Sequence, residues 1–256
     1  MNLYGLKDAG KTWFDFLKKR LLELGCKQSV IESRLFTKDG ILLVIYIDNT
    51  ILISHHKTLI DVDIKSLQEG YNLTDDGELE DYLGTRSTKL SDGSIELSEP
   101  RIVKRVLQMV GLDNVSDRTK MHDTPDISTT LLDNDPNGAP HVVNWNYRSV
   151  VGTISYLQAT VCPNITFAVQ QCACFYNYPH RQHKDVVKKY FSYLLRTKDK
   201  SLVLRPEKSR GLECFVDTDL DVSWQNSFSN NPLSAHLRSR YGIMYTGCPI
   251  IWASKM

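Results

Sequence analysis

The chain has 256 residues, of which 41% are hydrophobic and 24% are charged, and its formal net charge is +1. This composition is typical of a globular protein and excludes a disordered one, and the near-neutral charge provides no overall field to attract nucleic acid. No run approaches the roughly 18 apolar residues of a membrane helix, and no secretion signal opens the chain. We therefore expect an intracellular protein, cytoplasmic or nuclear, with no membrane partner.

The first third of the chain predicts a helix followed by β-hairpins. Apolar residues spaced three and four apart predict a helix over 11–24, which Gly25 would end. Asp39-Gly40 between apolar runs predicts a hairpin that leads into a strand over 41–47. Because all seven residues of this strand are apolar or aromatic, we expect it to be covered on both faces. A second hairpin would follow, with Asp48 and Asn49 at its tip.

The rest of the chain mixes helix and strand patterns, and residues 116–140 show no period and predict a linker. The predicted elements are a helix over 58–70, a hairpin over 83–97 that turns at Asp92-Gly93, helices over 98–111, 147–160, 164–176 and 183–195, and strands near 212–217, 241–245 and 250–252.

Two acidic positions stand directly after predicted strands. Asp48 would lie at a hairpin tip, and Asp217, with Asp219 two residues later, follows an apolar run. Carboxylates held rigidly at strand ends can bind the pair of divalent metal ions that phosphoryl transfer uses. An exposed acidic turn is the commoner explanation of each position, because Asp and Asn favour turns. The residues alone leave both interpretations open.

The six cysteines show no CxxC pair, and we interpret them as small buried residues of a reduced protein. One cluster invites a metal interpretation, namely Cys172, Cys174, His180 and His183. Its CxC and HxxH spacings fit zinc poorly. We expect the two histidines to face solvent or to cap a helix.

A series of short motifs resembles the reverse transcriptase and ribonuclease H region of copia-type retrotransposon Pol polyproteins. The motifs follow the family's order and cover nearly the whole chain: Leu3-Tyr4-Gly5-Leu6-Lys7 with Trp13, Tyr46-Ile47-Asp48-Asn49, Gly77-Glu78-Leu79, Tyr82-Leu83-Gly84, Tyr147–Gly152, Pro163-Asn164-Ile165, His183–Leu195, Asp217-Thr218-Asp219 and 247–255. Residues 46–49 stand where the family carries its YVDD metal-binding turn.

The resemblance implies an α+β fold, with a partial right-hand polymerase palm and thumb-like and connection helices before an incomplete ribonuclease H-like α/β domain. The implied regions are a palm and thumb remnant (1–115), a linker (116–140), a helical connection (141–208) and the start of the ribonuclease H-like domain (209–256). Such enzymes copy RNA into DNA and degrade the RNA of the hybrid with Mg²⁺ or Mn²⁺. The partners of the parent enzyme are therefore an RNA template and an RNA–DNA hybrid, bound through phosphates and shape.

The same resemblance reveals departures at the implied sites. Asn49 replaces the second Asp of the metal-binding turn and is a poorer ligand, and Asp8 replaces a Gln near the nucleotide site. The other carboxylates of both centres would lie before residue 1 and after residue 256. The implied metal ligands are thus Asp48 in one centre and Asp217 with Asp219 in the other. Neither centre is expected to bind its metal pair productively.

From these departures we expect a truncated reverse transcriptase and ribonuclease H fragment that is catalytically inactive by itself. The alternative is a non-catalytic module that binds nucleic acid or pairs with an intact reverse transcriptase. Its contacts would be the basic residues at 101, 104 and 105, or at 188 and 189. A third hypothesis is residual ribonuclease activity with carboxylates supplied by another chain.

Overall fold

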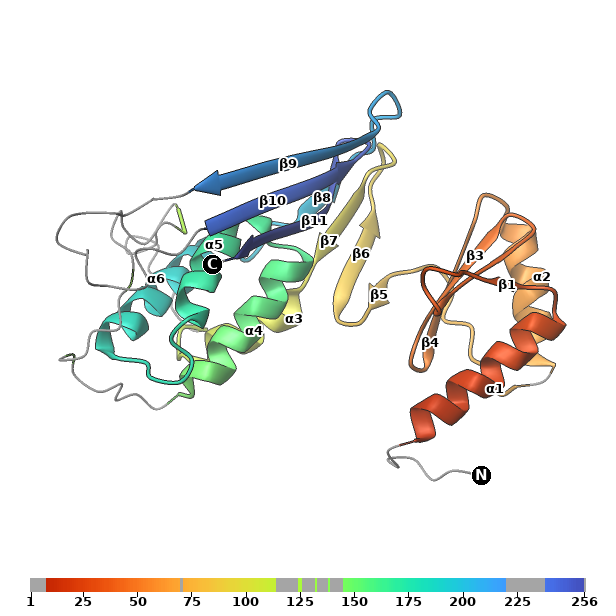
Figure 1. The fold of residues 1–256 in the computed structure, drawn as a ribbon, viewed down its shortest axis with the longest axis horizontal. Coiled ribbons are helices and arrows are strands. Elements are labelled where there is room, and N and C mark those ends of the chain that lie inside the picture. The colour runs from red at the N-terminus through yellow and green to blue at the C-terminus, as the bar shows by residue number, and fades with distance from the viewer. Residues whose placement is uncertain are drawn as a thin grey trace. The chain divides into compact units, whose positions relative to one another are not determined.

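The computed structural model describes residues 8–69, 71–113, 124–125, 132, 138, 145–219 and 238–255. It divides into two compact units, residues 1–79 and 80–256. Each unit combines helices with antiparallel sheets, which confirms the predicted α+β class (Figure 1). No helix in the described part of the chain is long and apolar enough to cross a membrane.

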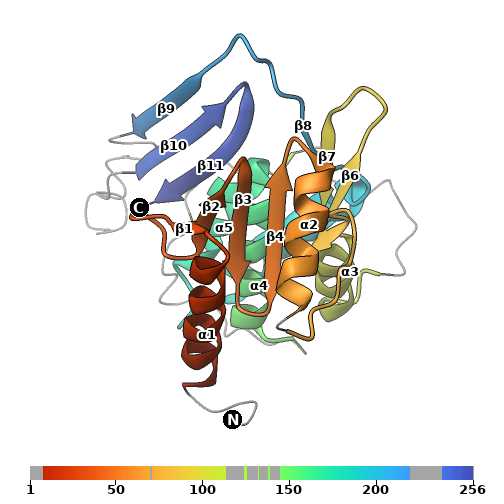
Figure 2. The same cartoon turned by 90° about the vertical axis from the view of Figure 1, so that its right-hand side faces the viewer.

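The first unit is a four-stranded sheet with two helices. Its elements are α1 (Ala9–Glu23), β1 (Lys27–Gln28), β2 (Leu35–Lys38), β3 (Ile41–Tyr46), β4 (Asn49–Ser54) and α2 (Lys57–Gln68), and the strands lie in sequence order (Figure 2). The predicted end of α1 is confirmed. Gly25 has a φ of +84°, its N–H donates to Leu22 O, and the Cys26 N–H donates to Leu21 O. This pair of hydrogen bonds is the Schellman motif.

One face of this sheet packs on α1 and α2, and the other face is open. Along β3, Ile41, Leu43 and Ile45 are buried among the residues of the two helices, whereas Leu42 and Tyr46 are exposed. Ile53 of β4, the cross-strand neighbour of Leu42, is also exposed. The prediction of a strand covered on both faces is therefore wrong within the described residues. Residues 41–47 are all apolar or aromatic, so they lack the alternation of apolar and polar residues that normally marks a half-buried strand.

The second unit contains a helical core with two sheets. Its elements are β5 (Asp81–Tyr82), β6 (Thr85–Lys89), β7 (Ile95–Ser98), α3 (Pro100–Met109), α4 (Tyr147–Thr160), η2 (Pro163–Ile165), α5 (Thr166–Ala173), α6 (Arg181–Thr197), β8 (Leu202–Leu204), β9 (Leu212–Asp219), β10 (Arg238–Tyr245) and β11 (Cys248–Lys255). The sheet orders are β5-β6-β7-β8 and β11-β10-β9. The core is formed by α3, α4, α5 and α6, so residues 100–109 share it with 147–197.

Most predicted elements occur in the described residues, whereas the short strands β1 and β8 were not predicted. The helix expected over 164–176 is split into η2 and α5, and the tight turn at Leu83-Gly84 between β5 and β6 was not predicted. The expected linker lies outside the described residues except at positions 124, 125, 132 and 138. The implied palm, thumb, connection and ribonuclease H regions, with boundaries at 115, 140 and 208, stay predictions.

Candidate active site

The first candidate site is the turn between β3 and β4. Tyr46 pairs with Asn49 across the strands, so the two-residue turn consists of Ile47 and Asp48. The predicted tip is therefore displaced by one residue, because Asn49 already begins β4. Ile47 has a φ of +53°, which a β-branched residue rarely adopts and which glycine usually supplies at this turn position. Backbone strain of this kind is typical of functional turns and costs about 1–3 kcal/mol.

This turn presents one carboxylate to solvent. Ile47, Asp48 and Asn49 are all exposed. The carboxamide of Asn49 is neutral, so it adds an acceptor oxygen but no negative charge beside Asp48. The strand–turn–strand element that was predicted is present. Its turn carries one negative charge, whereas a pair of aspartates would carry two.

Sequence reasoning missed Arg34, which lies beside this turn. Its guanidinium carbon is 5.8 Å from the centre of the Tyr46 ring, within the range of a cation–π contact. The Ile45 N–H donates to Arg34 O at 3.0 Å, which ties the residue to the turn end of β3. The register of β2 and β3, which pairs Leu35 with Val44, would have revealed this neighbour.

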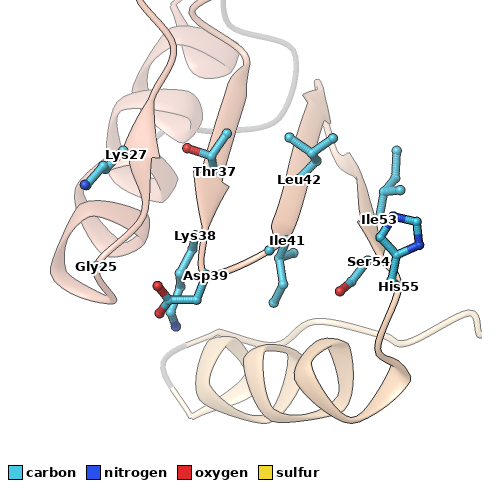
Figure 3. A pocket seen from close by; sticks show the side chains of 11 residues that line it. Gly25, Lys27, Thr37, Lys38, Asp39, Ile41, Leu42, Ile53, Ser54 and His55 are labelled. Atoms are coloured by element: carbon cyan, nitrogen blue, oxygen red, sulfur yellow. The ribbon is translucent and has the colours of Figure 1, made fainter.

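A pocket of about 550 Å³ lies at the opposite end of β3, around the Asp39-Gly40 turn (Figure 3). Lys38 lines it and forms an ion pair with Asp63, with 2.6 Å between Nζ and Oδ1. The hydrogen bond to Asp63 raises the pKa of Lys38. The pocket contains none of the predicted site residues, and this cation is already neutralised by a buried carboxylate.

The second candidate site is Asp217, in the second unit. It lies on β9 directly opposite Arg240 of β10, and Arg240 Nη1 is 3.8 Å from Asp217 Oδ2. The Arg240 guanidinium carbon is also 4.8 Å from the centre of the Phe167 ring of α5. Asp219 ends β9 and pairs through its backbone with Arg238. The exposed Asp217 carboxylate therefore has a cation as its neighbour.

The described residues do not fit the divalent metal pairs that the family resemblance implies. No group of three His, Cys, Asp or Glu side chains gathers within the described parts of the chain. Asp48 is followed by a neutral residue, and Asp217 faces an arginine. A metal pair requires several carboxylates that converge on it.

The cysteine and histidine cluster is explained by packing. Cys172 is buried in the helical core, and burial raises the pKa of its thiol to about 12. The Cys174 thiol is exposed and donates to Gln170 O. His183 is fully buried, stacks on Phe175 and accepts the His180 N–H at 2.8 Å, as the capping interpretation predicted. The expectation that the cysteines are all buried is wrong for Cys174 and Cys214, which are exposed.

The basic residues proposed as nucleic-acid contacts lie on helix surfaces. Arg101 forms an exposed ion pair with Asp81, with 2.8 Å between Nη2 and Oδ2. Positions 104 and 105 on α3, and 188 and 189 on α6, are also exposed. Such residues are usually only solvated, and nothing in their geometry selects a nucleic-acid partner.

Comparison with known proteins adds an independent observation. Residues 1–123 match the family model described as reverse transcriptase (RNA-dependent DNA polymerase). Over 99% of its length, the chain is 26% identical to the retrovirus-related Pol polyprotein from transposon RE1 of Arabidopsis thaliana. The chain is a relative of the copia-type retrotransposon Pol polyproteins.

Two further relatives extend this result. The chain is 23% identical over its whole length to the Pol polyprotein from transposon TNT 1-94 of Nicotiana tabacum. It is also 23% identical, over 99% of its length, to a protein named for transposon Ty5-1 in Saccharomyces cerevisiae. The chain spans 16% of the RE1 Pol polyprotein, 19% of the TNT 1-94 polyprotein and 79% of the Ty5-1 protein. No solved structure matches the chain.

Proposed function

We propose that this chain is a reverse-transcriptase-derived polypeptide that keeps the strand–turn–strand element of a polymerase without completing its metal centre. The observation that carries the proposal is the sequence of the turn, in which Asn49 follows Asp48 at the start of β4. Groups that act together in catalysis are strongly non-additive, so the loss of one carboxylate abolishes most of the activity. The expected behaviour is that of a catalytically inactive member of its family.

The finer regional assignment forms part of the same proposal. Residues 1–115 would correspond to a palm and thumb remnant, 141–208 to a helical connection and 209–256 to the start of a ribonuclease H-like domain. The antiparallel sheet of β9, β10 and β11, with Asp217 on its first strand, supports the last assignment. The partners implied for the parent enzyme are an RNA template and an RNA–DNA hybrid.

Primer extension on an RNA template tests the catalytic part of the proposal. The purified chain is assayed with Mg²⁺ and with Mn²⁺, beside the variants Asp48→Ala and Asn49→Asp. The expected result is no product above the Asp48→Ala background. Extension by the unaltered chain that Asp48→Ala abolishes would refute the proposal. A gain of activity in Asn49→Asp alone would show that this position limits the reaction.

A second candidate function is polynucleotide binding at the open face of the first sheet. Arg34 makes no ion pair within the described residues and lies against the exposed Tyr46. Aromatic rings stack on bases, and a guanidinium binds phosphate through parallel hydrogen bonds. This pair therefore offers both contacts that a single strand needs, beside the Ile47-Asp48 turn.

Fluorescence anisotropy with a labelled single-stranded oligonucleotide, measured in increasing KCl, tests this binding. Arg34→Gln should weaken the affinity for the oligonucleotide by about threefold or more. It should also lower, by about one, the slope of the logarithm of the binding constant against the logarithm of the KCl concentration. Arg148→Gln, which removes an exposed arginine on α4, is the matched control and should change neither value. Equal effects of the two substitutions would indicate diffuse charge attraction and no binding site at Arg34.

A further inference from the structure

Asp217 of β9 is in contact with Arg240 of β10. The β9–β10 register places the two residues directly opposite each other, and their charged atoms are 3.8 Å apart. The Asp217 side chain is 70% exposed, so solvent and ions can reach its carboxylate. The Arg240 side chain is 38% exposed, so the aspartate is the more accessible member of the pair.

Arg240 is held in place by Phe167 of α5. Its guanidinium carbon is 4.8 Å from the centre of the Phe167 ring, and its Nε is buried without a hydrogen-bond partner among the described residues. The sheet is anchored close by, since α5 packs against β11 and Trp252 Nε1 donates to Gln158 O at 2.7 Å. The guanidinium therefore cannot move far from Asp217 without losing its contact with Phe167.

We propose that Arg240 is the built-in counter-ion of Asp217 and excludes divalent cations from this carboxylate. A divalent ion bound to Asp217 would approach a guanidinium that is itself 3.8 Å from the carboxylate oxygen. Like charges so close together repel each other, and the repulsion doubles for a doubly charged ion. Because both side chains are partly exposed, the repulsion is largest at low ionic strength. This exclusion of cations does not depend on Asn49, which belongs to the other candidate site. It therefore goes beyond the proposed function.

Mn²⁺ binding by the full chain, followed by the electron paramagnetic resonance of free Mn²⁺ at low salt, tests the inference. Asp217→Asn is compared in two backgrounds, the unaltered chain and Arg240→Met, whose apolar side chain can still pack on Phe167. In the unaltered chain the substitution should leave Mn²⁺ binding unchanged. In the Arg240→Met background it should weaken binding by about tenfold, because the carboxylate has become available.

Two further variants separate charge from packing. Arg240→Gln is also neutral and should behave like Arg240→Met, which keeps the test valid if Arg240→Met does not fold. Arg240→Lys keeps the charge and should behave like the unaltered chain. The inference is wrong if Asp217→Asn weakens Mn²⁺ binding equally with and without Arg240, or if it has no effect in any background. It is also wrong if Arg240→Lys gains Mn²⁺ binding as the neutral variants do.

Discussion

The two units bury their apolar residues in different ways. Among the described residues, eight buried hydrophobic side chains form the core of the first unit, on one face of its sheet. Nineteen form the core of the second unit, mainly between helices. The first unit therefore depends more heavily on each buried side chain, and it leaves Leu42, Tyr46 and Ile53 on an open sheet face.

The largest expected effect comes from truncating a core aromatic residue in the smaller core. Phe36 is fully buried beneath α1 and α2, and Phe36→Ala should cost about 3–5 kcal/mol of unfolding free energy. Hydrogen exchange should show the loss of protection in the elements of the first unit, from α1 to α2, and not in the second unit. Phe191→Ala, at an equally buried position in the second unit, should deprotect residues 100–109 and 147–197 instead. Equal loss in both units from either variant would mean that the units unfold together.

A smaller but still large effect is expected at the buried ion pair of the first unit. Asp63 is 6% exposed, and Lys38→Met would leave its carboxylate buried without a cation, at a cost of about 3 kcal/mol. Urea unfolding should also show that Asp63→Leu, added to Lys38→Met, restores most of this loss.

The exposed pair of Arg205 and Asp92 in the second unit provides the control. Arg205→Met should cost far less unfolding free energy than Lys38→Met, because solvent screens both groups. Similar costs for Arg205→Met and Lys38→Met would contradict the assignment of Lys38 and Asp63 as a buried pair.

Local chemistry made much of the fold predictable from the sequence. The helix end at Gly25 and the turn at Asp39-Gly40 follow from short-range rules, and both are present. The Ile47-Asp48 turn was misplaced by one residue because isoleucine there opposes its own backbone preference. Arg34 and Arg240 were missed because each acquires its role through cross-strand neighbours. Such register depends on tertiary packing and is not visible in a single sequence.

Glu99 of the second unit contrasts with Asp63, since it is 2% exposed and has no cation among its hydrogen-bond partners. Burial raises the pKa of the Glu99 carboxyl above its ordinary value of 4.5, and contacts with Thr85 and Thr160 partly offset this. Because the pKa is higher in the folded state, stability falls as pH rises from the ordinary value through the raised one. Glu99→Gln should therefore stabilise the chain at pH 7. The gain in unfolding free energy should be smaller than the losses expected for Phe36→Ala and Lys38→Met.

Unfolding free energies at pH 4 and pH 7 check this prediction. The difference between Glu99→Gln and the unaltered chain should shrink at the lower pH, where the carboxyl is already neutral in the folded state. A destabilised variant at pH 7, or a difference that is independent of pH, would contradict the assignment of Glu99 as a buried carboxyl.

The smallest expected effect concerns the strained turn. Ile47→Gly should raise stability by about 0.5–1 kcal/mol, because relief of the positive φ exceeds the entropy that glycine loses. Leu83 also has a φ of +53° in the second unit, and Leu83→Gly should act in the same direction. Asn49→Gly, at a residue without a positive φ, should destabilise instead. Thermal unfolding of the three variants measures these differences, and a destabilised Ile47→Gly would disprove strain at the turn.

The most direct test of the central claim follows polymerisation and hybrid cleavage together on one RNA template with a DNA primer. The unaltered chain and Asp48→Ala are assayed in parallel, with Mg²⁺ or Mn²⁺. The account predicts that neither protein extends the primer or cleaves the hybrid. Extension by the unaltered chain that disappears in Asp48→Ala would show that Asp48 belongs to a complete catalytic centre, and would contradict the claim.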